Sequence, residues 1–237
     1  MIKLERTSVM NFENAIRGAR NPMNSWNKMD SVHCQKEQMI CCPKDPVKCP
    51  KDGNWDEDWF CIGKNDMALL KRLRKAGPDH RKFMRQIFVS VDILAPLYWW
   101  KEMDQYRVAV VSNSCSTMHK IHAKEFTLDD FSHEYLFDSS MCELESVIER
   151  MNFWRTKFII QSNKETADEN YATAKQCWWQ MIQLLPSSYN QLRTVTMNYE
   201  TLVNIYHARK NHKLDEWHEL CDWIKTLPYA KELIVCE

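Results

Sequence analysis

The chain has 237 residues, 44% of them hydrophobic, and its 32 basic residues balance 32 acidic ones, so one domain with a large core is expected over residues 1–237. The zero net charge argues against a duplex-DNA binder, and four glycines without GxGxxG or GxxxxGK argue against Rossmann and P-loop sites. Because no apolar run has the length of a signal peptide or membrane span, we expect a cytoplasmic protein with no membrane or nucleic-acid partner and mostly reduced cysteines.

The first third of the chain shows two helix signals on either side of an irregular segment. Apolar side chains fall on one helical face over residues 10–20. Pro-Lys-Asp repeats mark residues 21–63 as a long irregular excursion, whose cysteine-rich part covers about 31–62. A second helix is predicted over 65–76, and Gly77-Pro78 ends it.

The rest of the chain alternates strand and helix signals in a mixed order. The expected elements are a strand at 86–94, a helix opened by Pro96, a capped turn at 127–134, an antiparallel helix pair at 139–161 and 164–184, a strand at 192–199, and helices at about 200–210 and 214–226. This order is not a βαβ alternation, so the predicted class is α+β.

Two stretches resemble the flavin-dependent thymidylate synthases. Between residues 77 and 120 the matches to that family's segments are His80, Ala95-Pro96, Arg107, Asn113 and Ser116. The second stretch, LPSSYNQLRTVTMNYETLVNIYHARKN, matches a Leu-Pro and then a Thr-x-Asn-x-x-x-Leu-x-Asn-x-x-x-x-Arg run without a gap. Its matching positions are Leu185, Pro186, Thr196, Asn198, Leu202, Asn204 and Arg209.

The same stretches also depart from the family pattern. Gln105 and Tyr106 replace the first two residues of Arg-His-Arg, while Ser114 and Met118 stand where the family has Glu and Arg. Near the N-terminus, the AIRGAR helix is followed by Pro22 where the family has Ser. Each lost charged contact weakens phosphate binding by about 1.5–3 kcal/mol.

The resemblance implies a thymidylate synthase-complementing-protein-like fold, an antiparallel sheet with helices and a helical pair inserted in the C-terminal half. It also implies FAD as cofactor and reductive methylation of dUMP to dTMP, with methylenetetrahydrofolate and NADPH as co-substrates, in a homotetramer. Such chemistry depends on placing two stacked rings rather than on a protein nucleophile.

Roles carry over residue by residue. Asn198 and Asn204 are expected at the flavin ring, and Arg209 at the nucleotide base in a catalytic role. Arg107 and His80 are further cofactor-binding candidates, while Ser116 and Asn113 are substrate-binding candidates. Each also has a plainer interpretation as a cap, an ion-pair partner or a surface group.

Other residues favour structural interpretations. Cys115 could be a nucleophile only with a neighbouring base, and the sequence identifies none for it. The histidines His119, His122 and His133 do not complete a recognisable zinc-binding pattern. Trp99-Trp100 and Trp178-Trp179 are typical of core or interface positions. The cysteine cluster contains no CxxC, so zinc is a minority alternative there. Its members are Cys34, Cys41, Cys42, Cys49 and Cys61.

Two rival functions remain open. One is a divergent homologue that modifies another pyrimidine nucleotide. The other is a non-catalytic flavin- or nucleotide-binding protein, with a purely structural oligomer as a third class.

Overall fold

The computed structural model describes residues 2–33, 60–163, 165–168 and 170–236. Its centre is a four-stranded antiparallel sheet in the order β1-β4-β6-β5. The strands are β1 Lys3–Met10, β4 Phe88–Pro96, β5 Val110–Ser114 and β6 Asn190–Asn198. The expected strands at 86–94 and 192–199 are therefore confirmed as β4 and β6 with shifted ends, whereas β1 and β5 were not expected.

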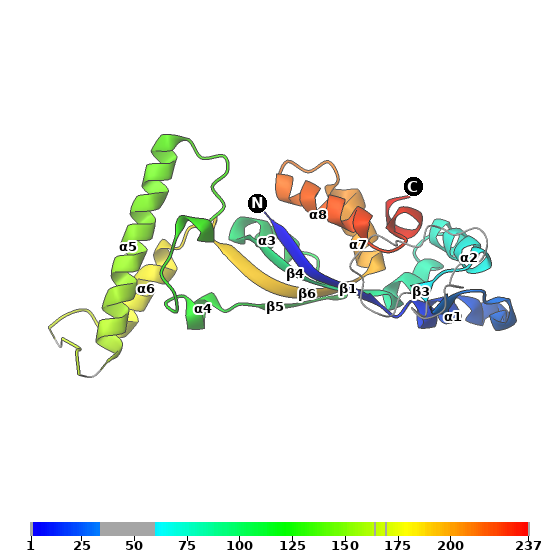
Figure 1. The fold of residues 1–237 in the computed structure, drawn as a ribbon, viewed down its shortest axis with the longest axis horizontal. Coiled ribbons are helices and arrows are strands. Elements are labelled where there is room, and N and C mark those ends of the chain that lie inside the picture. Colours follow the sequence, from blue (N-terminus) through cyan, green and yellow to red (C-terminus); the bar gives the residue numbers. More distant parts are fainter. Residues whose placement is uncertain (1, 34–59, 164, 169, 237) are drawn as a thin grey trace.

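One face of the sheet is covered by helices. Val89, Val91 and Ile93 of β4 are at most 1% exposed, while Ser90 and Asp92 between them are partly exposed. This period of two places the apolar side chains on one face. The helices on that side are α3 Leu97–Met103, α7 Tyr199–Arg209 and α8 Asp215–Thr226 (Figure 1). The core that they build contains Trp99 and Trp100, as predicted for that pair.

A second group of elements lies at one end of the sheet. It consists of α1 Phe12–Arg20, η1 Asn21–Met23, η2 Trp26–Lys28, β2 Val32–His33, β3 Phe60–Cys61, α2 Lys64–Lys75 and η3 Arg81–Gln86. A buried ion pair joins α1 to α2, with Arg20 Nε 2.6 Å from Asp66 Oδ1. The other oxygen of Asp66 accepts both the Asp30 and the Ser31 backbone N–H at 3.0 Å.

The other end of the sheet carries the expected helix pair, α5 Asp138–Ser162 and α6 Ala174–Leu184, which pack against each other (Figure 1). The expected start of α6 at 164 is wrong by ten residues. Thr173 and Gln176 form a capping box, which fixes the start of the helix at Ala174. The pair has a core of its own, with Met151 and Met181 fully buried.

Short elements complete the chain. They are α4 Thr117–Lys120, η4 Leu128–Asp130 with a Thr127–Asp130 capping box, and a C-terminal π-helical turn, η5 Lys231–Val235. The turn expected at 127–134 corresponds to η4. Among the described residues, no helix has both the length and the apolar character needed to cross a membrane.

Candidate functional site

A cavity of about 740 Å³ opens where η3, the first turns of α7 and the loop at 105–109 meet. This volume is within the range of small-molecule sites. The three segments come from distant parts of the chain. The polar residues that line the cavity, called the cleft below, are Arg81, Arg85, Gln105, Tyr106, Arg107, Asn198, Glu200, Thr201 and Asn204.

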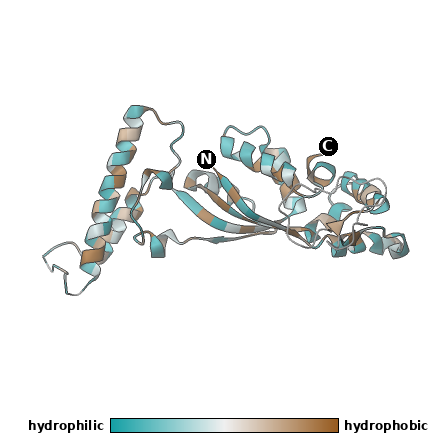
Figure 2. Ribbon diagram, in the orientation of Figure 1, coloured by the Kyte–Doolittle hydropathy of each residue, from teal (hydrophilic) through white to brown (hydrophobic). Residues whose placement is uncertain are grey.

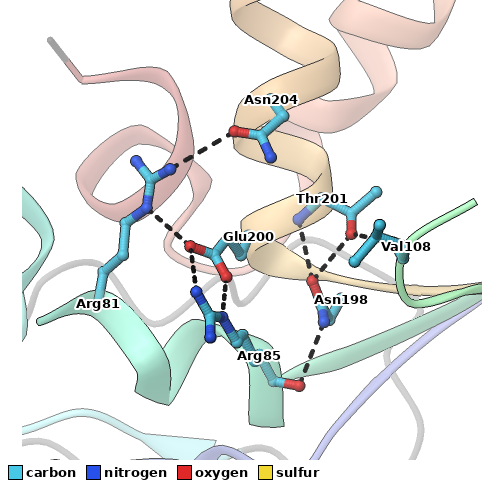
Figure 3. Close-up of polar contacts among 7 residues, drawn as sticks. All are labelled: Arg81, Arg85, Val108, Asn198, Glu200, Thr201 and Asn204. Carbon is cyan, nitrogen blue, oxygen red and sulfur yellow. Dashed lines mark hydrogen bonds and ion pairs between the residues drawn. The ribbon is translucent and has the colours of Figure 1, made fainter. Parts of the chain in front are cut away.

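Asn198 links the elements at the base of the cleft. It ends β6 and caps α7, because its Oδ1 accepts the Thr201 backbone N–H at 2.9 Å. Its Nδ2 donates to the Arg85 carbonyl oxygen at 3.3 Å, which links α7 to η3 (Figure 3). The side chain is 4% exposed. In the structure, therefore, the amide of Asn198 bonds within the chain and fixes the position of its neighbours.

Glu200 lies between two arginines of η3 (Figure 3). Arg81 Nε donates to its Oε1 at 3.0 Å, and Arg85 Nε donates to its Oε2. Burial by itself would raise the pKa of Glu200, but the bonds and charges of Arg85 and Arg81 outweigh it and lower that pKa. Arg81 also approaches Asn204, with Nη2 3.5 Å from Oδ1. Glu200 is therefore ionised at neutral pH and shared by both guanidinium groups.

The loop between α3 and β5 forms the opposite wall. Ala109 in this loop has a φ of 55°, a left-handed conformation that is rare for a residue with a Cβ. Thr201 Oγ1 donates to the Val108 carbonyl oxygen at 3.1 Å and so ties the loop to α7. The Val108 side chain is 84% exposed, which leaves an apolar group at the edge of the cleft. Arg107 beside it is exposed, and its Nε lies 3.4 Å from the Asp104 carbonyl oxygen.

Arg209 sits at the end of α7 in a network of aromatic and acidic groups. Its Nη1 is 2.7 Å from Glu102 Oε2, and its Nε donates to the Tyr106 hydroxyl at 2.8 Å. Its guanidinium also lies 4.5 Å from the ring centre of Trp217. His212 and Trp217 share the same Glu102 oxygen. Arg209 therefore reaches the cleft through Tyr106, which lines it, and is not itself one of the lining residues.

The remaining candidates lie elsewhere. Ser116 lines a separate cavity of about 340 Å³, together with Cys115, and its Oγ accepts the His119 backbone N–H at 3.1 Å. Asn113 is exposed on β5 and pairs with Thr194 of β6. His80 is exposed just before η3.

The structure thus brings Asn198, Asn204 and Arg107 together in one cleft and leaves the other four candidates outside it. It adds Arg81, Arg85 and Glu200, which the sequence analysis did not single out. A partial signal existed, because Arg81 and Arg85 are four residues apart, the spacing at which two side chains share one side of an α-helix. The segment instead forms the 3₁₀ helix η3, in which side chains three residues apart lie above each other, so this spacing alone does not bring the two arginines together. Their partner Glu200 is far away in the sequence, so no local pattern connects the three.

The metal alternative concerns mostly residues that are not described. Cys34, Cys41, Cys42 and Cys49 lie outside the described residues, and Cys61 is buried on β3. Within the described part of the chain, no group of three or more His, Cys, Asp or Glu side chains is placed to hold a metal ion.

No family model and no curated protein matches the chain. Solved structures do. Flavin-dependent thymidylate synthase ThyX from Helicobacter pylori, in a crystal structure with FAD and dUMP, has a TM-score of 0.57 at 13% identity, over 99% of this chain and 97% of that one. A second ThyX structure from the same organism, also complexed with FAD and dUMP, has a TM-score of 0.56 at 14% identity, over 99% and 98%. The mixed helical and antiparallel fold is therefore similar to that of ThyX.

Proposed function

We propose that the cleft binds a flavin and a pyrimidine nucleotide, and that the protein is an enzyme of the flavin-dependent thymidylate synthase type. One observation supports this most directly. Asn198, Asn204 and Arg107, taken from two separate stretches of family resemblance, meet in a single cavity of about 740 Å³. If the sequence resemblance were accidental, there would be no reason for matched residues from separate stretches to line the same cavity.

The residues of the cleft suit the two ligands. Asn204 offers a carboxamide, with both a donor and an acceptor, to the pyrimidine edge of a flavin. Arg107 supplies a guanidinium group for a phosphate. Asn198 fixes the start of α7 and so sets the direction of the helix that carries Asn204. FAD bound there would supply hydride transfer.

The finer assignment follows the resemblance. The proposed reaction is reductive methylation of dUMP to dTMP with methylenetetrahydrofolate and NADPH, in a cytoplasmic homotetramer. Arg209 would contact the nucleotide, Ser116 and Asn113 would belong to the substrate side, and His80 to the cofactor side. Arg209, Ser116, Asn113 and His80 lie outside the cleft in one chain, so these roles require a rearrangement or a neighbouring subunit.

Flavin uptake tests the proposal. We expect the purified protein to bind FAD and to show flavin absorbance near about 450 nm. With reduced flavin and methylenetetrahydrofolate present, it should release tritium from 5-tritiated dUMP. Protein that takes up no added FAD would contradict the proposal at its first step.

A non-catalytic flavin- or nucleotide-binding protein is the second candidate, and one observation favours it. Arg209, the proposed catalytic group, is bound by Glu102 and Tyr106 within the chain. Flavin binding without tritium release from dUMP would support this candidate. Tritium release from a different 5-labelled pyrimidine nucleotide would support a divergent enzyme instead.

A further inference from the structure

Positive charge dominates the cleft. Three guanidinium groups line it, from Arg81, Arg85 and Arg107, against the single carboxylate of Glu200. Asp79 lies close enough to act on Arg85 as a weaker, longer-range charge, but it does not line the cleft. An anion that enters the cleft therefore meets a net attraction.

The two arginines of η3 differ in how far the chain encloses them. The Arg81 side chain is 17% exposed, while that of Arg85 is 51% exposed. The bonds between Arg85 and Glu200 involve Nε and Nη2 of the guanidinium. A guanidinium has five N–H donors in a planar fork. Donors of Arg85 thus remain on its exposed side for a ligand oxygen.

Glu200 explains how the arginines stay together without a ligand. The two guanidinium groups lie close enough to bond the same carboxylate, and like charges at such a separation repel each other. Glu200, carried by α7, accepts bonds from both and holds them at the wall of the cleft (Figure 3). Its carboxylate occupies the position toward which a phosphate oxygen would be drawn.

We propose that Arg85 and Arg81 form the phosphate-binding wall of the cleft, with Arg85 as the main contact and Glu200 as the carboxylate with which a phosphate competes for both guanidinium groups. The ligand group is a phosphate monoester or diphosphate, which a planar guanidinium binds through two parallel hydrogen bonds. The inference rests on the proposed function in taking this phosphate to belong to a flavin or a nucleotide.

Variants that each change the charge of one side chain by one unit test whether this wall binds phosphate. Inorganic pyrophosphate is the first probe, with binding measured by calorimetry. Relative to wild type, Arg85→Gln should weaken binding by about 10- to 150-fold, the equivalent of one charged hydrogen bond. Glu200→Gln should tighten it several-fold, since the cleft loses its carboxylate while the amide oxygen still accepts a bond from Arg81. Arg150→Gln, on α5 at the far end of the molecule, makes the same charge change and should alter nothing (Figure 1).

FMN and riboflavin form the second probe, because they share the ring and differ by the phosphate. Wild type should prefer FMN, and Arg85→Gln should lose that preference while its riboflavin affinity stays unchanged. Arg85→Lys, which keeps the charge but not the planar fork, should lie between the two. A purely structural role for Arg85 would weaken both flavins alike.

The outcomes separate the two proposals. Pyrophosphate binding that responds to Arg85, without binding of either flavin, overturns the proposed function and supports the phosphate wall. Equal binding of FMN and riboflavin by wild type, with Arg85→Gln matching Arg150→Gln, overturns the phosphate wall and leaves flavin binding intact. If Arg85→Gln fails to fold, the result for Glu200→Gln decides, since unchanged or weaker pyrophosphate binding contradicts the inference.

Discussion

Arg209 shows how much depends on the partners of a single side chain. By its position in the sequence it matches a nucleotide-binding arginine, yet it bonds to Glu102 and Tyr106 and stacks on Trp217. These two sets of partners make different predictions for nucleotide binding. If Arg209 touches the nucleotide, its effect on binding does not depend on Tyr106. If Arg209 acts indirectly, it does so by positioning the Tyr106 hydroxyl.

We expect Arg209→Ala to weaken dUMP binding by at least about tenfold while the fold persists. His212 and Trp217 still hold the Glu102 carboxylate in that variant. Dissociation constants for Arg209→Ala, Tyr106→Phe and the double variant measure the path of the effect. Additive losses indicate direct contact, and a shared loss indicates action through Tyr106. Unchanged dUMP binding in Arg209→Ala would remove this residue from the site.

Glu200 should make the free energy of unfolding depend on pH in the acid range. Its pKa is lowered in the folded protein, so its contribution is fully present above the ordinary carboxyl pKa and is lost as pH falls through the lowered value. Urea unfolding of wild type and Glu200→Gln, from about pH 6 to pH 3, measures this. The difference between the two proteins should shrink toward the acid end. A constant difference over that range would contradict the ionised pair.

The junction of α1 with α2 depends on one buried ion pair. Arg20 is 4% exposed and Asp66 is 0% exposed. Asp66→Asn leaves the Arg20 charge buried without its partner, and we expect a loss of about 3–5 kcal/mol in the free energy of unfolding. Asp222→Asn is the control. It breaks an exposed pair with Lys225 and should cost under about 1 kcal/mol. Equal effects in urea unfolding would mean that burial does not set the strength of the pair.

The helix pair α5–α6 extends the molecule beyond the sheet (Figure 2). Large apolar side chains are exposed on both of its helices. The exposed fractions are 42% for Phe153, 46% for Ile159, 38% for Ile160, 40% for Trp179 and 38% for Leu184. Several large apolar groups on one exposed pair of helices are typical of a contact surface between subunits. This pair is accordingly where we place contacts of the proposed homotetramer.

Light scattering tests that assembly. Wild type should have the mass of four chains, and Trp179→Lys should lower it. Met23→Lys changes an 81% exposed apolar residue of η1, which directly follows α1 at the opposite end of the sheet, and should leave the mass unchanged. A wild-type monomer would exclude the homotetramer.

Much of the fold could be read from local patterns. The apolar periods of two and 3.6 identified β4, β6 and most helices, and Gly77-Pro78 marked the end of α2. The strands that were missed lack this signal. In β5, Ser112, Asn113 and Ser114 are exposed, and β1 contains a register shift between Glu5 and Ser8. An edge strand of this kind is defined by the neighbour to which it bonds, not by its own periodicity.

For the site, the sequence determined which residue types stand in the register of a flavin- and nucleotide-binding family, including Asn198, Asn204 and Arg107. Tertiary structure alone decided which of them meet. In the folded chain Asn198 caps α7, and Arg209 forms an ion pair with Glu102. Glu200 lies between Arg81 and Arg85 and bonds to both. The reason is that helix and strand periods act between near neighbours in the chain. A pair such as Arg85 and Glu200 depends on the pairing of β4 with β6 and on the contact of η3 with α7, which bring together residues far apart in the chain.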